Sequence, residues 1–386
     1  MAKKINVGLI GHMFMGKAHS LGYKDMAMFF PDAELKPVMK MLVGLGEESV
    51  RQAAEQYGWE SYGTDYKELL ARDDIQLVDI ATGNDTHREM ALAAAQAGKH
   101  IFCEKPMAMN VAECKEMIAA VEKAGVKHMI DFNYRAVPAV ALAKKMIDDG
   151  LIGKIYHWRA VYLQDWIMDP SFPLVWRLIK KNAGSGPHGD LNAHLIDLAR
   201  FLVGEIDEVV GMMETFIKKR PLLEAATGGL TAKASEKMGD VTVDDAALFL
   251  ARFENGAIGS FEATRFAGGR RNGNRFEING SEGSIAFNLE RMNELEYYSK
   301  NDPAYAQGFR TIIVGESVHP YMNAWWPPGH IIGWQHTFVH QVYNLCNAIG
   351  RDRMPVPNFY DGLKCQQALE AVETSVENRE WVKIEK

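Results

Sequence analysis

The chain has 386 residues, 47% of them hydrophobic and 24% charged, and a formal net charge of −7. This length suffices for two domains with sizeable cores, and the acidic balance argues against nucleic acid or an anionic membrane as main partner. No secretory leader and no apolar run long enough to span a bilayer is apparent. Cys103, Cys114, Cys346 and Cys365 show no metal-ligand spacing, so we expect reduced thiols in a cytoplasmic protein.

The first third of the sequence alternates short apolar runs with segments of helical periodicity. We predict strands at 5–11, 35–44, 75–83, 100–106 and 127–134, and helices at 14–30, 47–58, 64–73, 85–99 and 111–123. Thr64 or Asp65 is expected to cap the third helix. Such alternation is typical of βαβ units whose parallel sheet is buried on both faces. We therefore predict an α/β, Rossmann-type domain over residues 1–133.

The pattern changes after residue 134, where longer runs alternate between apolar and polar residues. We predict strands within 154–166, 208–219, 244–266, 274–289 and 293–300, and helices at 138–150, 189–204, 335–350 and 361–378. Asn255-Gly256 and the segment 281–283 are hairpin-turn signals, and 221–243 is predicted to be a long loop. We expect an α+β domain over 134–386 with a large, mostly antiparallel, open-faced sheet. Its C-terminal helices are expected to pack back on the first domain.

The stretch VGLIGHMFMGKAHS, residues 7–20, has the form of a strand that turns sharply into a helix. In such turns, backbone amides and the positive helix end hold a pyrophosphate. Gly11 and Gly16 fit a G-x-G-x-x-G pattern, but Met13 stands where the middle glycine belongs. Taken alone, a cofactor loop and a purely structural turn are equal alternatives. The candidate cofactor residues of this loop are Gly11, His12, Met13, Phe14, Met15 and Gly16.

Polar residues follow two further predicted strands. Thr82, Asn84 and His87 come at the carboxyl end of strand 75–83, the edge at which parallel sheets bind ligands. The alternative is that Asn84 or Asp85 merely caps the next helix, and for Asp85 we favour this alternative.

The motif CEKP places Glu104, Lys105 and Pro106 at the end of an apolar strand. A lysine so close to a buried strand is costly unless it has a partner or a task. Its ammonium group can donate to a substrate hydroxyl and stabilise a developing alkoxide. The alternative is an edge lysine whose charge extends into water.

In GDLNAHLIDLARFL, Asp190, His194 and Asp197 are spaced i, i+4 and i+7, hence on one face of a helix. A carboxylate beside an imidazole fixes its tautomer and raises its basicity. His188 just before offers a second imidazole. Alternatively, this carboxylate–histidine pair lies on the surface or binds a metal ion. A third and fourth ligand at a suitable spacing are lacking, so no metal is expected.

In this order along the chain, the motifs GLIG…MGKAHS, DIATGNDTH, CEKPMA, FNYR and GDLNAHLIDLARFLVG resemble those of the glucose–fructose oxidoreductase / inositol dehydrogenase family, called Gfo/Idh/MocA. The resemblance implies that Lys105 holds the reacting hydroxyl and that His194 is the general base, oriented by Asp190. It further implies a cofactor contact from Asn133 beside the nicotinamide, with Glu104 and Lys105 also near the cofactor. The sugar pocket would be lined by Tyr134, Arg135, Gln164, Asp165 and Trp166.

The sequence departs from this family at several points. Besides Met13, Gly83 stands where a proline usually follows Ala-Thr. At the end of the second strand, Gly44 occupies the position where an acid would bind the adenosine ribose. Glu47 could reach that ribose, and the lack of an arginine for a 2′-phosphate favours NAD over NADP, although NADP is possible.

The resemblance implies NAD(P)-dependent oxidation of a secondary hydroxyl of a small sugar or glycoside. Within the family, the chain looks closest to the branch that acts at the 3-position of glucosides, C-glucosides and anhydrosugars, and a homo-oligomer is expected. Two alternatives are a redox glycosidase that retains its NAD with no net oxidation, and a non-catalytic dinucleotide-binding regulator. The presence of Lys105, Asp190 and His194 together argues against the regulator.

Overall fold

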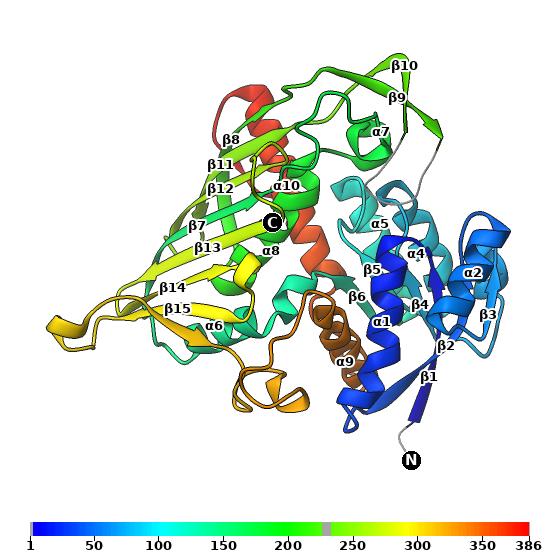
Figure 1. Cartoon of the computed structure of the whole chain (residues 1–386), viewed down its shortest axis with the longest axis horizontal. Helices are drawn as coiled ribbons and strands as arrows, with labels where there is room; N and C mark the ends of the chain where they lie inside the picture. Colours follow the sequence, from blue (N-terminus) through cyan, green and yellow to red (C-terminus); the bar gives the residue numbers. More distant parts are fainter. Residues whose placement is uncertain (1–2, 226–232, 386) are drawn as a thin grey trace. The chain divides into compact units, whose positions relative to one another are not determined.

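The computed structural model describes residues 3–225 and 233–385. They divide into two compact units (Figure 1). The first unit contains residues 3–133 and 335–366, and the second contains 134–225, 233–334 and 367–385. Residues 335–366 include helix α9 (His336–Gly350), so the first unit is completed by a segment from near the end of the chain.

The first unit is built on a six-stranded parallel sheet among the residues described. Its strands lie in the order β3 (Ser61–Gly63), β2 (Leu35–Val43), β1 (Lys3–Ile10), β4 (Leu77–Ile80), β5 (His100–Glu104) and β6 (His128–Asp131). The helices between them are α1 (Phe14–Phe29), α2 (Glu47–Tyr57), α3 (Tyr66–Leu70), α4 (His87–Gln96) and α5 (Val111–Ala124). The strand order reverses between β1 and β4, where such sheets bind their ligands. The Rossmann-type prediction is confirmed, with β3 as an unpredicted edge strand.

Local sequence signals explain where these helices begin. The Asp65 side chain accepts a hydrogen bond from Lys67 N at 2.9 Å and caps α3, which decides between the two predicted caps. Asn110 caps α5 by accepting from Glu113 N at 2.9 Å, and the Glu113 carboxylate accepts from Met109 N at 3.0 Å. This pair satisfies one amide that the first helical turn leaves unbonded and one that lies just before the helix.

Helix α9 packs against α1 within the first unit (Figure 1). A Cβ atom on Gly22 would lie 3.0 Å from the carbonyl oxygen of Phe338, so the two helix backbones approach closely at this glycine. The contact completes the core on the α1 side of the sheet.

The second unit contains a nine-stranded sheet among the residues described. Its strands lie in the order β16 (Arg310–Ile313), β15 (Glu294–Ser299), β14 (Gly283–Asn288), β13 (Gly273–Gly280), β7 (Ile155–Leu163), β12 (Ile258–Thr264), β11 (Ala246–Phe253), β8 (Ile206–Glu214) and β17 (Val382–Lys383). Only the β7–β12 pair among them is parallel. This confirms the predicted mostly antiparallel sheet and both hairpin turns.

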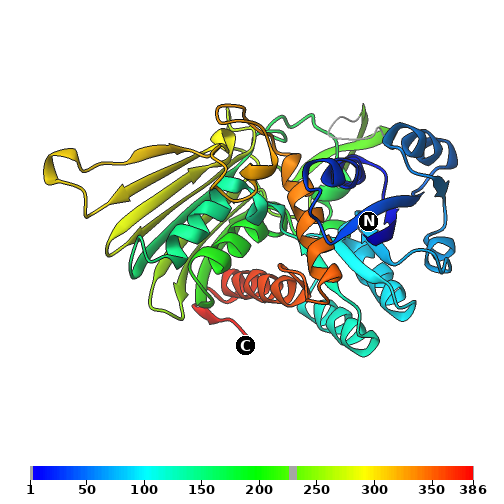
Figure 2. The ribbon, with the colours of Figure 1, turned by 90° about the horizontal axis from the view of Figure 1, so that it is seen from below.

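Helices cover one face of this sheet (Figure 2). They are α6 (Pro138–Asp148), α8 (Ala193–Leu202) and α10 (Phe359–Asn378), while the short α7 (Lys180–Ala183) precedes α8. The opposite face exposes large apolar side chains, including Met212, Leu248, Leu250 and Ile258. In β11 these exposed residues alternate with buried ones, as expected for a strand with only one covered face.

The prediction of a long loop over 221–243 is wrong for the residues that the structure describes. Strands β9 (Lys219–Ala225) and β10 (Lys233–Asp240) pair antiparallel, while 226–232 lie outside the described residues. β10 reads KASEKMGD and has no apolar alternation, so the sequence carried no strand signal. Arg220 anchors β9, since its buried guanidinium donates to the carbonyls of Ile167 and Asp169 at 2.5 and 2.8 Å.

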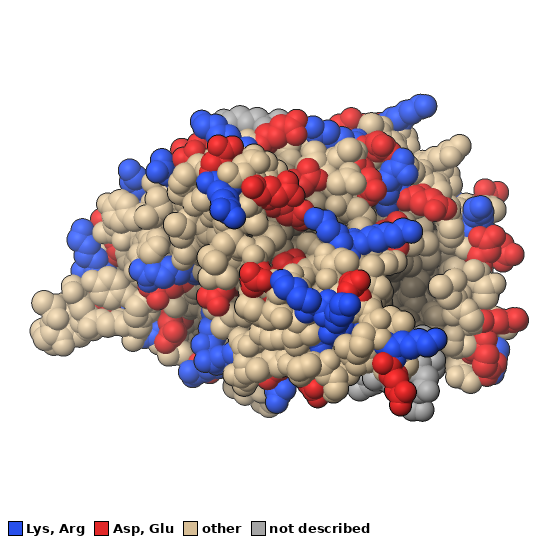
Figure 3. All heavy atoms as spheres, turned by 90° about the horizontal axis from the view of Figure 1, so that it is seen from above, with Lys and Arg blue, Asp and Glu red and all other residues tan. Residues whose placement is uncertain are grey.

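Lysine and arginine side chains intermingle with acidic ones over the face drawn in Figure 3. In the part of the chain that is described, no helix has both the length and the apolar character needed to cross a bilayer. The four cysteines are buried and form no disulfide among the described residues.

Candidate active site

The glycine loop joins β1 to α1, and each of its glycines is required by its surroundings. Gly11 has φ +107°, and a Cβ atom there would lie 2.3 Å from Ala81 O. A Cβ atom on Gly16 would lie 1.9 Å from Gly11 O. Met13, by contrast, has φ −79° and a side chain that is 53% exposed. A residue with a side chain is therefore accommodated at the middle position without the positive φ that favours glycine.

The same loop fits a bound dinucleotide. Met13 is the N-cap of α1 and makes no side-chain cap hydrogen bond, and the first turn carries no acidic residue. The helix end therefore presents its positive dipole to an anion, as in other pyrophosphate-binding turns. Phe14, which begins α1, is 62% exposed. NAD would lie with its pyrophosphate against residues 11–16.

The next group of candidates follows β4. Asn84 begins a single 3₁₀ turn, Asn84–Thr86, and Thr86 rather than Asp85 is the N-cap of α4. The hydroxyl groups of Thr82 and Thr86 lie 2.7 Å apart. His87 is fully buried, and burial lowers its pKa, so its ring is neutral.

His87 is used by the protein's own main chain. Its Nδ1 lies 2.9 Å from Pro106 O, while Nε2 lies 3.3 Å from Thr82 O. A neutral ring has one N–H, and the shorter contact identifies Nδ1 as the donor. His87 thus ties the loop after β5 to the start of α4.

Glu104 holds the backbone of Lys105 at the end of β5. Its Oε2 accepts a hydrogen bond from Lys105 N at 3.0 Å, and the Lys105–Pro106 peptide bond is cis. The Glu104 side chain is buried and that of Lys105 is partly exposed. The Glu104 carboxylate therefore holds the backbone of Lys105 in place, and this carboxylate is itself held by a residue of α1.

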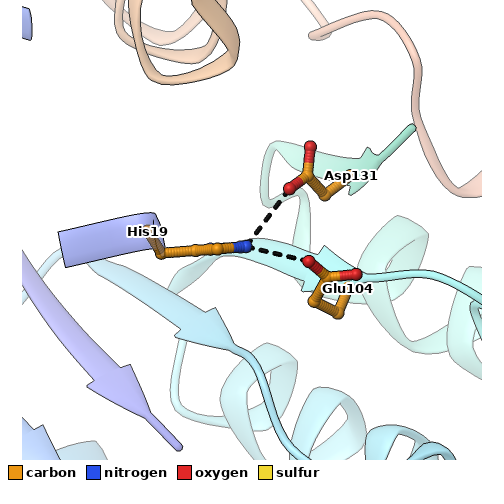
Figure 4. Close-up of side chains that lie close together, drawn as sticks. All are labelled: His19, Glu104 and Asp131. Carbon is orange, nitrogen blue, oxygen red and sulfur yellow. Dashed lines mark hydrogen bonds and ion pairs between the residues drawn. The ribbon is translucent and has the colours of Figure 1, made fainter. Parts of the chain in front are cut away.

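Glu104 is fixed by His19, which lies on α1 and has no exposed surface. His19 Nε2 lies 3.0 Å from Glu104 Oε1 and 3.2 Å from Asp131 Oδ2 (Figure 4). Its Nδ1 lies 2.8 Å from Asp79 Oδ2, which also accepts from Tyr23 OH at 2.8 Å. One imidazole therefore faces carboxylates from β4, β5 and β6. We call these four residues, His19, Asp79, Glu104 and Asp131, the His19 cluster.

Both ring nitrogens of His19 face carboxylates, which requires an imidazolium. Burial alone lowers the pKa of His19, but the charge of Asp79 and hydrogen bonds to the three carboxylates raise it well above its ordinary value. His19, Glu104 and Asp131 also have donor atoms close enough together for a metal ion. The two carboxylates lie 3.0 and 3.2 Å from Nε2, within ion-pair distance, and we interpret the cluster as an ion-pair network.

Asn133 follows β6 and is 5% exposed. Its Nδ2 donates to Thr337 Oγ1 of α9 at 2.9 Å. Helix α9 thus holds the side chain of Asn133, the residue that the family resemblance places beside the nicotinamide.

In the second unit, the structure brings His194 and Tyr134 together. Their ring centroids are 4.4 Å apart, and the Tyr162 ring lies 5.9 Å from that of His194. The two tyrosine hydroxyls are 2.7 Å apart, and Tyr162 OH donates to Asn272 Oδ1 at 2.6 Å. Burial and the adjacent Tyr134 raise the pKa of Tyr162. The imidazole of His194 therefore packs against two tyrosine rings whose hydroxyl groups meet each other and the amide of Asn272.

Asp190 does not lie in a regular α-helix. Residues His188–Asn192 form a π-helical turn before α8, so the predicted helix exists but its first turn is wider than the i, i+4 spacing assumed. Asp190 Oδ2 accepts from Arg265 Nη2 at 2.6 Å, and Arg265 is 1% exposed. Single π-helical turns are frequent at functional sites. His188 is fully buried, with Nε2 3.0 Å from Leu369 O, and serves packing.

The predicted pocket residues after β7 belong to the same group. Trp166 Nε1 donates to Gln164 Oε1 at 2.9 Å, and Gln164 Nε2 donates to Asn272 Oδ1 at 3.2 Å. The guanidinium of Arg265 lies 5.2 Å from the Trp166 ring centre. Asp165 pairs with Arg271 at 3.0 Å.

Arg135, another predicted pocket residue, forms an ion pair with Asp197 that neutralises its charge. Its Nε and Nη2 donate to the two carboxylate oxygens of Asp197 at 2.9 and 2.6 Å, and both side chains are buried. The Arg135 guanidinium also lies 5.0 Å from the Phe201 ring centre. The carboxylate of Asp197 is therefore bound by Arg135, although its spacing in the sequence had grouped it with Asp190 and His194.

Sequence reasoning missed several residues of this arrangement. Two of them carried a usable signal: Arg265 continues the buried alternation of Phe261 and Ala263 along β12, and an arginine in such a position requires a partner. His19 likewise lies on the buried stripe of α1. Asn272 lies in a turn, and no pattern marks it.

A Rossmann-type sheet with a fitted glycine loop, followed by a unit that gathers a histidine, hydroxyls and amides, defines a dinucleotide-dependent oxidoreductase. Residues 5–132 match the family model described as oxidoreductase family, NAD-binding Rossmann fold, and residues 140–286 match the GFO/IDH/MocA C-terminal domain. The chain belongs to the GFO/IDH/MocA family of NAD-binding oxidoreductases, as the motifs predicted.

Among curated proteins, the chain is 45% identical to levoglucosan dehydrogenase from Pseudarthrobacter phenanthrenivorans over 99% of this chain and 98% of the relative. Among solved structures, levoglucosan dehydrogenase in complex with NADH and levoglucosan is 44% identical, with a TM-score of 0.94 over 99% of this chain and 100% of that one. An oxidoreductase domain protein from Kribbella flavida is 50% identical, with a TM-score of 0.94 over the whole of both chains.

Proposed function

We propose that this chain is an NAD-dependent dehydrogenase that oxidises a secondary hydroxyl of a sugar. We propose further that the substrate is a glucoside, C-glucoside or anhydrosugar oxidised at C3. The observation that carries the proposal is the buried His194 packed against Tyr134, whose hydroxyl group meets that of Tyr162. Sugars are bound by such combinations of hydroxyl, amide and aromatic groups. The similarity to levoglucosan dehydrogenase over the full length supports the same class of substrate.

The catalytic roles that we propose are those that the family resemblance implies, and the chemistry of each side chain suits its role. His194 takes the proton of the reacting hydroxyl on an imidazole nitrogen, and Asp190 holds the charge that this ring acquires. Lys105 donates to the same hydroxyl and stabilises the developing negative charge on its oxygen. NAD held against residues 11–16 would supply the acceptor for the hydride that leaves this carbon. Arg265 fixes Asp190, and Glu104 fixes the backbone of Lys105.

The proposal is tested first on substrates. Levoglucosan, an O-glucoside, a C-glucoside and myo-inositol are incubated with NAD or NADP while absorbance is followed at the wavelength of NADH, and the product is examined by NMR. We expect NADH to form with a glucoside or the anhydrosugar, and a ketone at C3. A ketone at another carbon would contradict the regiochemistry. Cleavage of a glycosidic bond without free NADH would instead identify a redox glycosidase.

The roles are tested by Lys105→Met and His194→Ala. Each should lower kcat by roughly a hundred- to ten-thousand-fold, the usual contribution of a proton-transfer group, with unchanged circular dichroism. Matched controls are Lys181→Met, whose side chain is exposed, and His157→Ala, near the start of β7. Activity of either test variant close to that of its control would reject the role of that residue.

We also propose that a second copy of this chain covers the open face of the large sheet. Met212, Leu248, Leu250 and Ile258 expose between 37% and 63% of their surface there, and contiguous apolar surface of this kind marks an interface. Light scattering coupled to size exclusion should give at least a dimer. Leu250→Glu should shift it toward the monomer, and an unchanged mass would contradict this placement. Four buried cysteines that form no disulfide among the described residues are compatible with a reducing compartment such as the cytoplasm.

A further inference from the structure

His12 and Gly44 lie side by side at the edge of the sheet where the dinucleotide binds. His12 comes two residues after the end of β1, and Gly44 directly follows β2. These strands are parallel neighbours, with Ile10 opposite Val43, and Gly11 N donates to Val43 O at 2.8 Å. In Rossmann domains, the residue that ends the second strand contacts the ribose of the adenosine.

The His12 ring occupies the place of a side chain on Gly44. A Cβ atom built on Gly44 would lie 2.0 Å from His12 Nδ1 and 2.9 Å from Cε1. Gly44 is not among the glycines with positive φ, so its backbone conformation does not require glycine. The imidazole of His12 is therefore the group that a larger residue at this position would have to displace.

No carboxylate replaces the missing acid next to Gly44. The following residues are Leu45, which is 87% exposed, and Gly46, and Glu47 only begins α2. His12 is 8% exposed, and its Nε2 has no hydrogen-bond partner among the described residues. A buried ring nitrogen without a partner is costly, and a ligand hydroxyl would supply that partner.

We propose that His12 replaces the missing acid as the residue that binds the adenosine ribose hydroxyls of NAD, and that Gly44 is small because this ring covers it. Burial lowers the pKa of His12, so the ring is neutral and offers one N–H and one acceptor to a hydroxyl group. Such a ring can hydrogen-bond to the two ribose hydroxyls of NAD. It carries no negative charge that would repel the 2′-phosphate of NADP. The inference rests on the NAD binding of this domain and not on the identity of the sugar.

The experiment measures the dissociation constants of NADH and NADPH by fluorescence titration without sugar, so an error about the substrate leaves it intact. The variants are His12→Ala, Gly44→Asp and the two combined. His12→Ala should weaken NADH binding by about three- to tenfold, the contribution of one or two hydrogen bonds. Gly44→Asp alone should weaken it by about tenfold, because its Cβ overlaps the His12 ring.

The double variant should bind NADH within about threefold of the parent protein, since the aspartate then has room to contact the ribose. It should bind NADPH more weakly than the parent, because the carboxylate repels the 2′-phosphate. The control His100→Ala changes a partly exposed ring at the opposite end of β5 and should leave both constants unchanged.

Three results would overturn the inference. One is an unchanged NADH affinity of His12→Ala, even if its melting temperature falls, which would assign the ring to packing alone. Another is Gly44→Asp binding NADH as tightly as the double variant. The last is a loss of NADH affinity in Glu47→Gln with none in His12→Ala, which would assign ribose binding to Glu47.

Discussion

Replacing His19 by phenylalanine removes the only cation of the His19 cluster and keeps a ring of similar shape. Asp79, Glu104 and Asp131 would then remain buried without their shared partner, since none is more than 5% exposed. Removing one member of a buried ion pair costs about 3–5 kcal/mol. For a unit of this size, each kcal/mol lowers the melting temperature by about 2–4 °C, so we expect a decrease of roughly 6–20 °C.

The pH dependence of unfolding separates loss of charge from loss of packing. Because the pKa of folded His19 is raised, its stabilisation is fully present below about pH 6.5 and is lost as the pH rises through the folded pKa. Between pH 6.5 and the pKa of folded His19, the contribution of His19 to the unfolding free energy of the parent protein should fall by up to about 1.4 kcal/mol per pH unit. The phenylalanine variant should lack this component.

His128→Gln is the matched control, because His128 is equally buried but neutral. Its Nδ1 accepts from Phe359 N at 3.1 Å, and burial lowers its pKa to about 4. His128 therefore destabilises the fold as the pH falls from 6.5 toward 4, by roughly 3 kcal/mol at the lower end, and the glutamine variant should lose this dependence. Urea unfolding followed by circular dichroism at several pH values measures both. A loss below about 1 kcal/mol in His19→Phe, or an unchanged slope above pH 6.5, would refute the ion-pair interpretation.

Further predictions concern the loop, the pocket and the helix contact. Met13→Gly should leave the NADH dissociation constant within about threefold, because the side chain is half exposed and φ is negative; a tenfold tightening would show that it crowds the pyrophosphate. Arg265→Met should lower kcat about tenfold or more through release of Asp190, and a shift confined to KM would contradict a role through Asp190. Gly22→Ala should lower the unfolding free energy by about 1–3 kcal/mol through its contact with α9, measured by urea unfolding.

The sequence allowed the Rossmann-type unit to be predicted almost strand by strand, because each buried strand there is an apolar run bounded by a turn. The edge strand β3 has only three residues, too few for a periodic signal. β9 and β10 escaped prediction because they are polar and are held by a side chain, Arg220, that bonds to carbonyls remote in sequence.

Candidate site residues could be named from the sequence where a motif lies on one helix or strand, but not where two distant segments must pair. Lys105 and His194 follow from local context and family motifs. The π-helical turn at Asp190 and its partner Arg265 are separated by 75 residues, and only the fold joins them. Met13 was the apparent defect of the glycine loop, and the backbone angles show that its position needs no glycine.

The contact between His12 and Gly44 also constrains how this sequence can evolve. Glycine and aspartate codons can differ by a single base, so an acidic residue at position 44 is always one mutation away. With the imidazole in place, however, that mutation meets an occupied site. We therefore expect loss of the ring at position 12 to precede selection of an acid at position 44. Among homologues, we expect large residues at position 12 to occur with glycine at 44, and small ones with Asp or Glu.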